Sequence, residues 1–364
     1  MSVSELTYHQ FRNLQSGSVK FHQTLNFVTG LNGSGKSSLL ESMFFIGHGK
    51  SFRTNSAEKI IQKDHEHFVV SILTSEQVRL GVKKSLVAQQ SELKINGLKC
   101  QRMSEFAQHI ALQIITPESF RLFSGGAKER RRFVDLGVFH VKHSFSSTWR
   151  HFSKVLKQRN ACLKLKSGNA QISQWNSQFV ELSNMLDELR EGYIEELSAQ
   201  LEHWLAILLP KLSLELDVSY QRGWSSKKDL ASVLVENQQR ELDKGFSLYG
   251  AHKFDIRFKL NGLDVESALS RGQQKLFLLA LTFSQTALIE RVKRVKPILL
   301  IDDIGAELDD KSRTAFKNAI KELDCQIIIT AIEQAALKPI LPDNDNYKMF
   351  HVEHGKITEV NLKA

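Results

Sequence analysis

Hydrophobic residues along the chain gather in short runs and in longer stretches, and each pattern predicts a different element. Short runs rich in β-branched and aromatic residues predict strands at 3–8, 19–21, 25–29, 112–116, 297–301 and 326–330. Alternating apolar positions at 68–101 predict antiparallel strands, with Asn96-Gly97 as a hairpin turn. Apolar stretches at 38–46 and 269–287 predict helices. Strands interleaved with helices predict an α/β fold.

Charge divides the middle of the chain into two runs. Residues 136–180 contain no acidic residue, whereas 181–202 hold seven acidic residues and Arg190 as their only cation. Ser167-Gly168-Asn169 lies between the charged runs and predicts a turn, so we expect an antiparallel helical hairpin. Two interpretations of the basic helix are open: it pairs with its acidic neighbour, or its outer face contacts nucleic-acid phosphates. The cations of the first run are Lys142, Arg150, Lys154, Lys157, Arg159, Lys164 and Lys166.

Composition and charge narrow the class of protein. The 364 residues are 41% hydrophobic and 24% charged, with only 5 prolines, which is typical of an ordered globular chain. The net charge of +9 favours polyanions such as nucleic acid or an acidic membrane surface. The 3 cysteines are scattered along the chain, which argues against a zinc site or a disulfide framework. This usage is typical of proteins in a reducing compartment. No apolar run approaches the roughly 20 residues of a membrane span, so we expect a cytoplasmic protein.

A glycine-rich segment follows the predicted strand at 25–29. The pattern G-x-x-x-x-G-K-[ST], whose backbone N–H groups cradle nucleotide phosphates, is present within Gly30-Leu31-Asn32-Gly33-Ser34-Gly35-Lys36-Ser37-Ser38. We expect Lys36 to reach the β- and γ-phosphates and Ser37 to place its hydroxyl on Mg²⁺. The segment therefore predicts binding of ATP or GTP. Arg12 and Asn13, at a turn between two strands, are candidates for contact with the base, although an ordinary loop is an equal interpretation.

Two later segments predict the rest of a nucleotide site. Ser270-Arg271-Gly272-Gln273 opens the apolar helix, and a serine, a glycine and a helix N-terminus can form an anion site, although a simple helix cap is an equal interpretation. The strand at 297–301 ends in Asp302 and Asp303. Asp302 is the expected Mg²⁺ ligand, and Asp303 is placed to orient or deprotonate the attacking water.

The order of these segments resembles the ABC-type ATPase heads, and among them the SMC-like DNA-repair group. The chain is most similar to the RecF family of bacterial recombination and gap-repair proteins. This resemblance implies a P-loop head with an antiparallel β subdomain, built from 1–117 and 263–364, and an inserted mainly helical lobe at 118–262. It is carried by Gly30 to Ser37, Ser51 to Thr54, Pro117-Glu118, Arg131 to Asp135, Gly250 with His252, Ser270 to Gln274, and Asp302 through Asp309.

The resemblance also implies an activity. In such heads the serine-glycine helix of one subunit covers the γ-phosphate held by its partner, so ATP joins two copies and hydrolysis releases them. RecF-like proteins bind duplex DNA near single-strand gaps and act with RecR and RecO in loading RecA during repair. Asp303 replaces the glutamate of many ABC ATPases, and Thr330-Ala331 stands where many carry a switch histidine. Both features lead us to expect a weak, slow ATPase.

Other classes that share the phosphate loop fit less well. In this chain Ser270 lies 233 positions after Ser37, and that distance holds a separate helical lobe. The nucleotide-binding subunit of a transporter does not account for such a lobe. A cohesin-like structural protein needs far longer arms than a helix over 171–209, which reaches about 58 Å. An ATPase fused to a nuclease needs more than the 55 residues after Asp309.

Overall fold

The computed structural model describes residues 2–87, 91–210, 216–292, 295–303, 308–342, 344 and 346–360. The chain forms two compact units: unit 1 is Met1–Ser119, His203–Lys211 and Arg271–Ala364, and unit 2 is Phe120–Glu202 and Leu212–Ser270. Compared with the boundaries expected from the sequence, unit 1 gains the segment from His203, and residues 263–270 belong to unit 2.

A parallel sheet forms the centre of unit 1. Its strand order is β15-β14-β3-β13-β12-β8, and every neighbouring pair is parallel except the hairpin β14–β15. Such central strands are covered on both faces, which explains their uninterrupted apolar sequences. The strands are β3 Leu25–Thr29, β8 Ala111–Ile115, β12 Pro297–Ile301, β13 Gln326–Ala331, β14 Tyr347–Glu353 and β15 Lys356–Val360.

An antiparallel sheet, of order β2-β1-β4-β5-β6-β7, is the second layer of unit 1. The Asn96-Gly97 turn between β6 and β7 is confirmed, with φ values of 50° and 84°. The strands are β1 Val3–His9, β2 Gly17–Lys20, β4 His67–Thr74, β5 Arg79–Ser85, β6 Glu92–Ile95 and β7 Leu98–Cys100.

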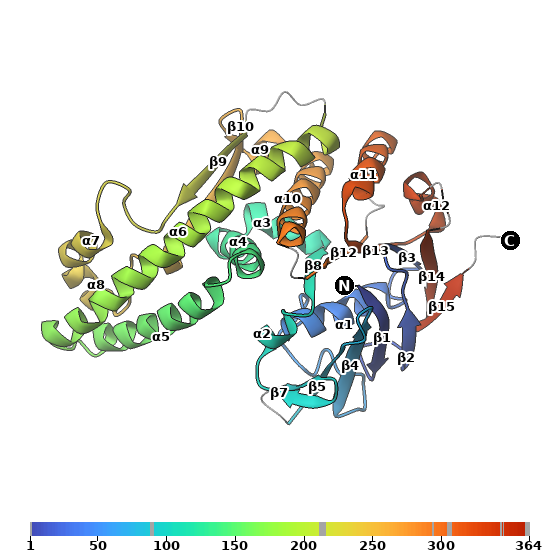
Figure 1. Cartoon of the computed structure of the whole chain (residues 1–364), viewed down its shortest axis with the longest axis horizontal. Coiled ribbons are helices and arrows are strands. Elements are labelled where there is room, and N and C mark those ends of the chain that lie inside the picture. The colour runs from blue at the N-terminus through green and yellow to red at the C-terminus, as the bar shows by residue number, and fades with distance from the viewer. Residues whose placement is uncertain are drawn as a thin grey trace. The chain divides into compact units, whose positions relative to one another are not determined.

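Helix α1 (Lys36–His48) lies between the two sheets of unit 1, and apolar residues of both sheets form one core with it (Figure 1). Helix α10 (Arg271–Arg291) packs against β8 and β12. β13 separates β3 from β12 in the sheet, and all three parallel strands end at the same edge. The remaining elements of unit 1 are α2 Met103–Phe106, α11 Asp310–Glu322, α12 Gln334–Leu337 and the 3₁₀ helices Pro117–Phe120 and Lys338–Ile340.

Unit 2 is mainly helical, as expected, and its longest elements are α5 (Phe145–Lys164) and α6 (Asn169–Leu208). They form the predicted antiparallel hairpin: Arg159 Nε donates to Asn176 Oδ1 at 2.8 Å, and Phe152 stacks on Phe179. Figure 1 shows the two helices side by side. The other elements are α3 Arg121–Ser124, α4 Ala127–Val141, α7 Leu230–Glu236, α8 Gln238–Lys244, α9 Val265–Ala268, the 3₁₀ helix Ala251–Lys253, and the sheet of β9 Leu216–Gln221, β10 Asp255–Leu260 and β11 Leu263–Asp264.

The hairpin does not use its opposite charges as its main contact. Of the cations in the basic run, Lys142 pairs with Glu196 of α6 at 2.8 Å, and buried Arg159 pairs with Glu241 of α8 at 2.6 Å. Within the part of the chain that the structure describes, the other five form no ion pair. These are Arg150, Lys154, Lys157, Lys164 and Lys166, and all five are exposed.

Candidate nucleotide-binding site

The phosphate loop connects β3 to α1, which is the strand-loop-helix context that its sequence predicts. Gly30 has φ +152°, and a Cβ placed on it would lie 2.3 Å from the carbonyl oxygen of Val352. Only glycine fits at that point. Gly35, at φ +123°, is the N-cap of α1. The phosphate loop therefore lies at the positive N-terminal end of this helix, where backbone N–H groups favour an anion.

Lys36 begins α1 and is buried. Its ammonium donates to the carbonyl oxygens of Gly30 at 2.6 Å and Leu31 at 3.0 Å. Burial lowers the pKa of Lys36, and the carboxylates of Asp302 and Asp303 oppose that shift. The cation therefore lies between the loop and the acidic pair, where a phosphate chain needs neutralisation.

Asp302 follows β12 directly and lies beside the start of α1. Its N–H donates to the carbonyl of Ile115 at 2.8 Å, which continues the ladder between β12 and β8. Ser37 Oγ donates to Asp302 Oδ1 at 3.2 Å, so the two expected metal ligands are in contact. A hydroxyl and a carboxylate are hard oxygen donors, and Mg²⁺ is commonly bound by one or two such groups together with phosphates. These residues fit Mg²⁺.

Asp303 has a left-handed backbone, with φ +53°. Its N–H donates to Thr330 Oγ1 at 2.9 Å, and its carbonyl accepts a hydrogen bond from Lys275 Nζ at 3.0 Å. This conformation is uncommon for a residue other than glycine and is maintained only where neighbouring groups hold it. Thr330 and Lys275 are two such groups, from β13 and α10.

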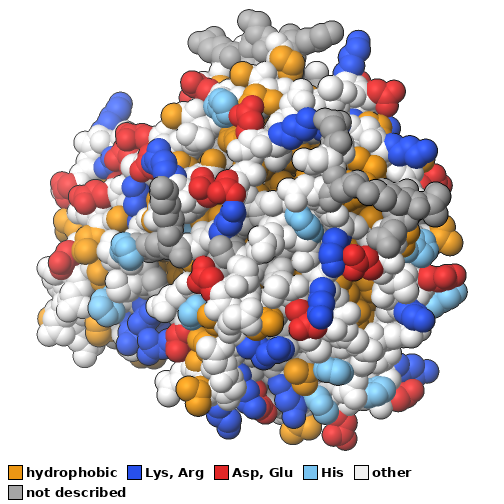
Figure 2. All heavy atoms as spheres, turned by 45° about the vertical axis from the view of Figure 1, so that its right-hand side comes forward, with side chains coloured by type: hydrophobic (Ala, Val, Ile, Leu, Met, Phe, Trp, Pro, Cys, Tyr) orange, Lys and Arg blue, Asp and Glu red, His pale blue; other side chains and the backbone are white. Residues whose placement is uncertain are grey.

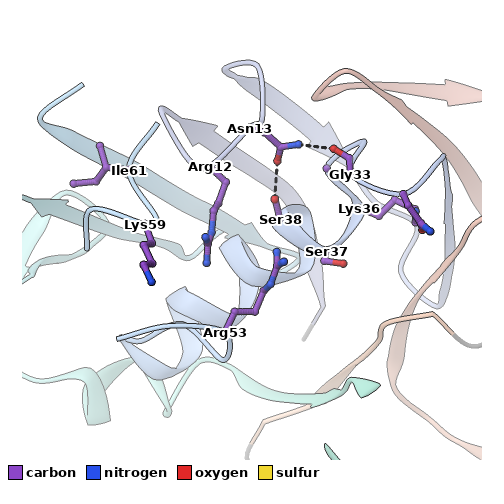
Figure 3. Close-up of a pocket in the computed structure, with 11 residues that line it drawn as sticks. Arg12, Asn13, Gly33, Lys36, Ser37, Ser38, Arg53, Lys59 and Ile61 are labelled. Atoms are coloured by element: carbon purple, nitrogen blue, oxygen red, sulfur yellow. Dashed lines mark hydrogen bonds between the residues drawn. The ribbon is translucent and has the colours of Figure 1, made fainter. Parts of the chain in front are cut away.

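A pocket of about 410 Å³ opens in front of the phosphate loop. Asn13 crosses from the neighbouring turn, where its amide donates to the Gly33 carbonyl at 2.9 Å and accepts from Ser38 Oγ at 2.8 Å (Figure 3). Asn13 therefore braces the loop in addition to lining the pocket. The lining residues are Arg12, Asn13, Asn32, Gly33, Gly35, Lys36, Ser37, Ser38, Arg53, Lys59 and Ile61.

Two arginines enter this pocket and share one buried carboxylate. Arg12 forms a two-pronged contact with Glu41 of α1, with Nε–Oε2 at 3.0 Å and Nη2–Oε1 at 2.6 Å. Arg53 Nη1 lies 3.8 Å from the same carboxylate, and the Ser51 hydroxyl donates to it. Figure 3 shows Arg12 and Arg53 extending toward α1 from opposite sides. The pocket thus has cations outside the phosphate loop.

The predicted serine-glycine segment is separate from this pocket. Ser270 is exposed and precedes the first residue of α10, while Arg271, Gly272 and Gln273 open that helix. Among the described residues these three do not line the phosphate-loop pocket. Glu307 of the Glu307-Leu308-Asp309 turn lies outside the described residues, and Asp309 is the N-cap of α11.

Sequence reasoning gave no role to Glu41, Thr330, Lys59 or Lys275. Arg53 was part of the family resemblance without a function of its own. A lone helix glutamate or strand threonine carries no spacing signal, because its partners come from distant parts of the chain. The one available indication was that Thr330-Ala331 stands where many ABC ATPases carry a switch histidine.

Phosphate loop, acidic pair and two-layer unit together define the chain as an ABC-type P-loop ATPase head. The family model described as RecF/RecN/SMC N terminal domain matches residues 2–358. The DNA replication and repair protein RecF of Colwellia psychrerythraea is 52% identical over 99% of this chain and 98% of its own length. The RecF of Pseudoalteromonas translucida is 39% identical over 98% of this chain and 99% of its own. The chain belongs to the RecF family.

Solved structures agree on the fold. One described as the recombination mediator protein RecF-ATPrS in the RecFOR pathway matches with a TM-score of 0.84 and 24% identity, over 99% of this chain and 98% of that one. An SMC head bound to the C-winged helix domain of ScpA matches with a TM-score of 0.60 and 16% identity, over 100% and 98% of the two chains. Within the described residues, the helices are all too short or too polar to cross a bilayer.

Proposed function

We propose that the chain is an ATP-gated DNA-binding protein of recombinational gap repair. ATP joins two copies of the head on duplex DNA near single-strand gaps, and slow hydrolysis separates them. The observation that carries this proposal is the assembly of Lys36, Ser37, Asp302 and Asp303 at one end of the parallel sheet. The same site supports ATP as the nucleotide and Mg²⁺ as its metal. Units 1 and 2 then serve as the two lobes of the head.

Each residue of the site has a part in this cycle. Lys36 binds the β- and γ-phosphates in place of the loop carbonyls it now contacts. Ser37 and Asp302 would hold Mg²⁺, and that ion would supply positive charge against the phosphate oxygens. Asp303 accepts a proton from the attacking water or orients it. Because its side chain is one methylene shorter than glutamate, hydrolysis is slow. Ser270 to Gln273 cover the γ-phosphate of the second copy.

Helix α5 supports DNA as the polyanionic partner. Arg150, Lys154, Lys157 and Lys164 follow one another at helical spacing, so they lie along one face for about 21 Å. That face is exposed, and the helix has no acidic residue to neutralise it. On the face shown in Figure 2, basic and acidic side chains are interspersed. The net charge of the chain does not tell which surface binds DNA. The row of cations on α5 is the best candidate for contact with phosphates because no acidic residue of that helix interrupts it.

The partners come from the family and from the names of its members. A solved relative is described as a recombination mediator of the RecFOR pathway. We infer that this chain likewise acts with RecR and RecO to promote RecA loading in the cytoplasm.

The test measures binding of fluorescent duplex DNA and ATP hydrolysis over a range of salt concentrations. Duplex DNA is expected to accelerate hydrolysis by the unaltered protein. The triple variant Arg150→Glu, Lys154→Glu, Lys157→Glu keeps basal hydrolysis, loses the acceleration, and lowers the slope of log affinity against log salt by about 3. Asp303→Asn should abolish basal hydrolysis, which would show that the measured ATP hydrolysis comes from this site and not from a contaminating ATPase.

A matched triple variant, Lys63→Glu, Lys227→Glu, Lys338→Glu, makes the same change in charge at three separated exposed positions. It should retain most of the DNA affinity. Equal losses in the two triple variants would show that net charge matters and the α5 face does not. An unaltered protein that ignores DNA at low salt would refute DNA binding itself.

A further inference from the structure

Thr330 lies at the carboxyl end of β13, directly beside the acidic pair. In the parallel ladder of β12 and β13, Ile301 is opposite Ile329, so the next residue of each strand is Asp302 on one side and Thr330 on the other. Thr330 is fully buried, with 0% of its surface exposed. The fold therefore gives its hydroxyl a fixed position between two carboxylate residues.

The hydroxyl of Thr330 makes two hydrogen bonds of opposite direction. It donates to Asp302 Oδ1 at 2.7 Å and accepts from the Asp303 N–H at 2.9 Å. A hydroxyl has one proton to donate and lone pairs to accept, so both bonds form at once. Asp302 Oδ1 also receives the Ser37 hydroxyl at 3.2 Å. One oxygen thus connects the expected metal ligand with the backbone of the expected catalytic carboxylate.

We propose that Thr330 is a positioning residue for ATP hydrolysis, which rests on the roles given above to Asp302 and Asp303. Through its donated bond it orients the Asp302 carboxylate toward Ser37 and Mg²⁺. Through its accepted bond it holds Asp303 in the left-handed conformation, φ +53°, that directs this side chain. Groups that orient metal ligands in this way commonly change metal affinity or activity by 10–100-fold when removed.

A positioning role for Thr330 predicts that Mg²⁺ dependence and kcat change while nucleotide affinity without Mg²⁺ does not. Loss of a purely structural threonine would change all three quantities. Nucleotide affinity in the absence of Mg²⁺ depends on the phosphate loop and Lys36, neither of which bonds to Thr330. Loss of the hydroxyl should leave that affinity intact. It should raise the Mg²⁺ concentration needed for full binding, because Asp302 is no longer oriented, and lower kcat, because Asp303 is released.

The decisive variant is Thr330→Val, which keeps the branched shape of the side chain and removes the hydroxyl. We expect kcat to fall by about 10–100-fold and the Mg²⁺ midpoint for fluorescent ATP binding to rise by about tenfold. Affinity for nucleotide in EDTA should change less than about twofold by the same reasoning. Thr330→Ser restores the hydroxyl and should recover both quantities.

A matched control is Thr282→Val in α10, which removes another buried threonine hydroxyl; among the described residues, that hydroxyl donates to the Leu278 carbonyl of its own helix and to no other group. It should leave kcat and the Mg²⁺ midpoint unchanged. An unchanged Mg²⁺ midpoint and kcat in a folded Thr330→Val protein would overturn the assignment, as would failure of Thr330→Ser to recover them. If the unaltered protein hydrolyses no ATP, the proposed function fails, and the Mg²⁺ midpoint still decides the role of Thr330.

Discussion

Glu41 is a buried carboxylate of α1, with 0% of its side chain exposed. It lies 2.6 Å from Arg12 and 3.8 Å from Arg53, which come from different parts of the chain. Removing one partner of a buried ion pair costs about 3–5 kcal/mol. Glu41 therefore fixes two arginines at the nucleotide pocket, and its own charge is tolerated because they are present.

His252 is a second buried ionisable residue, in unit 2. It packs against Phe152 and Phe179, and its Nε2 lies 3.0 Å from the carbonyl oxygen of Ser247. Burial lowers the pKa of His252 to about 4, and nearby cations such as Lys253 add to the shift. The family resemblance had left this histidine without a role. Its surroundings indicate that it is neutral and structural.

His252 predicts a pH dependence of stability. Between about pH 6.5 and pH 4 the unfolded chain binds a proton at this residue and the folded chain does not, so stability falls as the pH falls. His252→Gln cannot bind that proton. From pH 7 to pH 4 the unaltered protein should lose about 3 kcal/mol more unfolding free energy than this variant. Urea denaturation at several pH values measures the difference.

The exposed His151 of α5 provides the control. His151→Gln should follow the unaltered protein at each pH. Parallel curves for His252→Gln and the unaltered protein would contradict the assignment of a buried neutral imidazole.

Sequence predicted the site residues whose chemistry is encoded in spacing. Lys36, Ser37 and Asp302 meet as expected, because a strand, a loop and a helix force the first two together and a parallel strand ends at the same edge. Glu41 and Thr330 could not be predicted. Their roles depend on contacts with residues far away in the chain, and the one local indication was that Thr330-Ala331 stands where many ABC ATPases carry a switch histidine.

At the scale of elements, the turn between β14 and β15 supports the phosphate loop. The Gly355 N–H donates to the carbonyl of Ser34 at 2.8 Å, and its carbonyl accepts from the Gln15 N–H at 2.9 Å. A Cβ on Gly355, whose φ is +78°, would lie 2.0 Å from the Asn13 carbonyl oxygen. One turn therefore touches both the phosphate loop and the loop of Asn13.

We predict that Gly355→Ala weakens ATP binding by about tenfold or more, because displacement of Asn13 shifts the pocket by a fraction of an ångström or more. Gly97→Ala is the matched control: Gly97 occupies a hairpin turn with φ +84°, and its Cβ would meet nothing within 4 Å. Both variants carry the same backbone strain, about 1–2 kcal/mol. Only Gly355→Ala should change the Kd for fluorescent ATP, and equal Kd values in the two variants would remove the turn from the site.

The helical hairpin and four strands of the parallel sheet, β3, β8, β12 and β13, were predictable from charge and from apolar runs. The end of α6 was not. From His203 onward this helix belongs to unit 1, where Trp204 packs edge-on against Phe283 of α10. A continuous helix gives no composition change at such a boundary, so the predicted division placed 203–211 in the inserted lobe. Only the tertiary contacts of Trp204 distinguish the two segments.

At the scale of the whole molecule, the α/β class and the ATPase head followed from the sequence, and the match to the RecF and SMC heads confirms them. The role of Ser270 cannot be derived from one chain, because its expected ligand is held by a second copy. Ser270 is exposed at the start of α10, as a residue that contacts another subunit needs to be. The central claim is therefore that ATP brings two copies together.

The most direct test is the mass of the protein in solution, measured by analytical ultracentrifugation with ADP, with Mg²⁺ and ATP, and with ATP and duplex DNA. We predict the mass of one 41.4-kDa chain with ADP and of two chains with ATP. Ser270→Arg should bind ATP normally and remain a single chain. A protein that stays at 41.4 kDa with saturating ATP and duplex DNA would contradict the account.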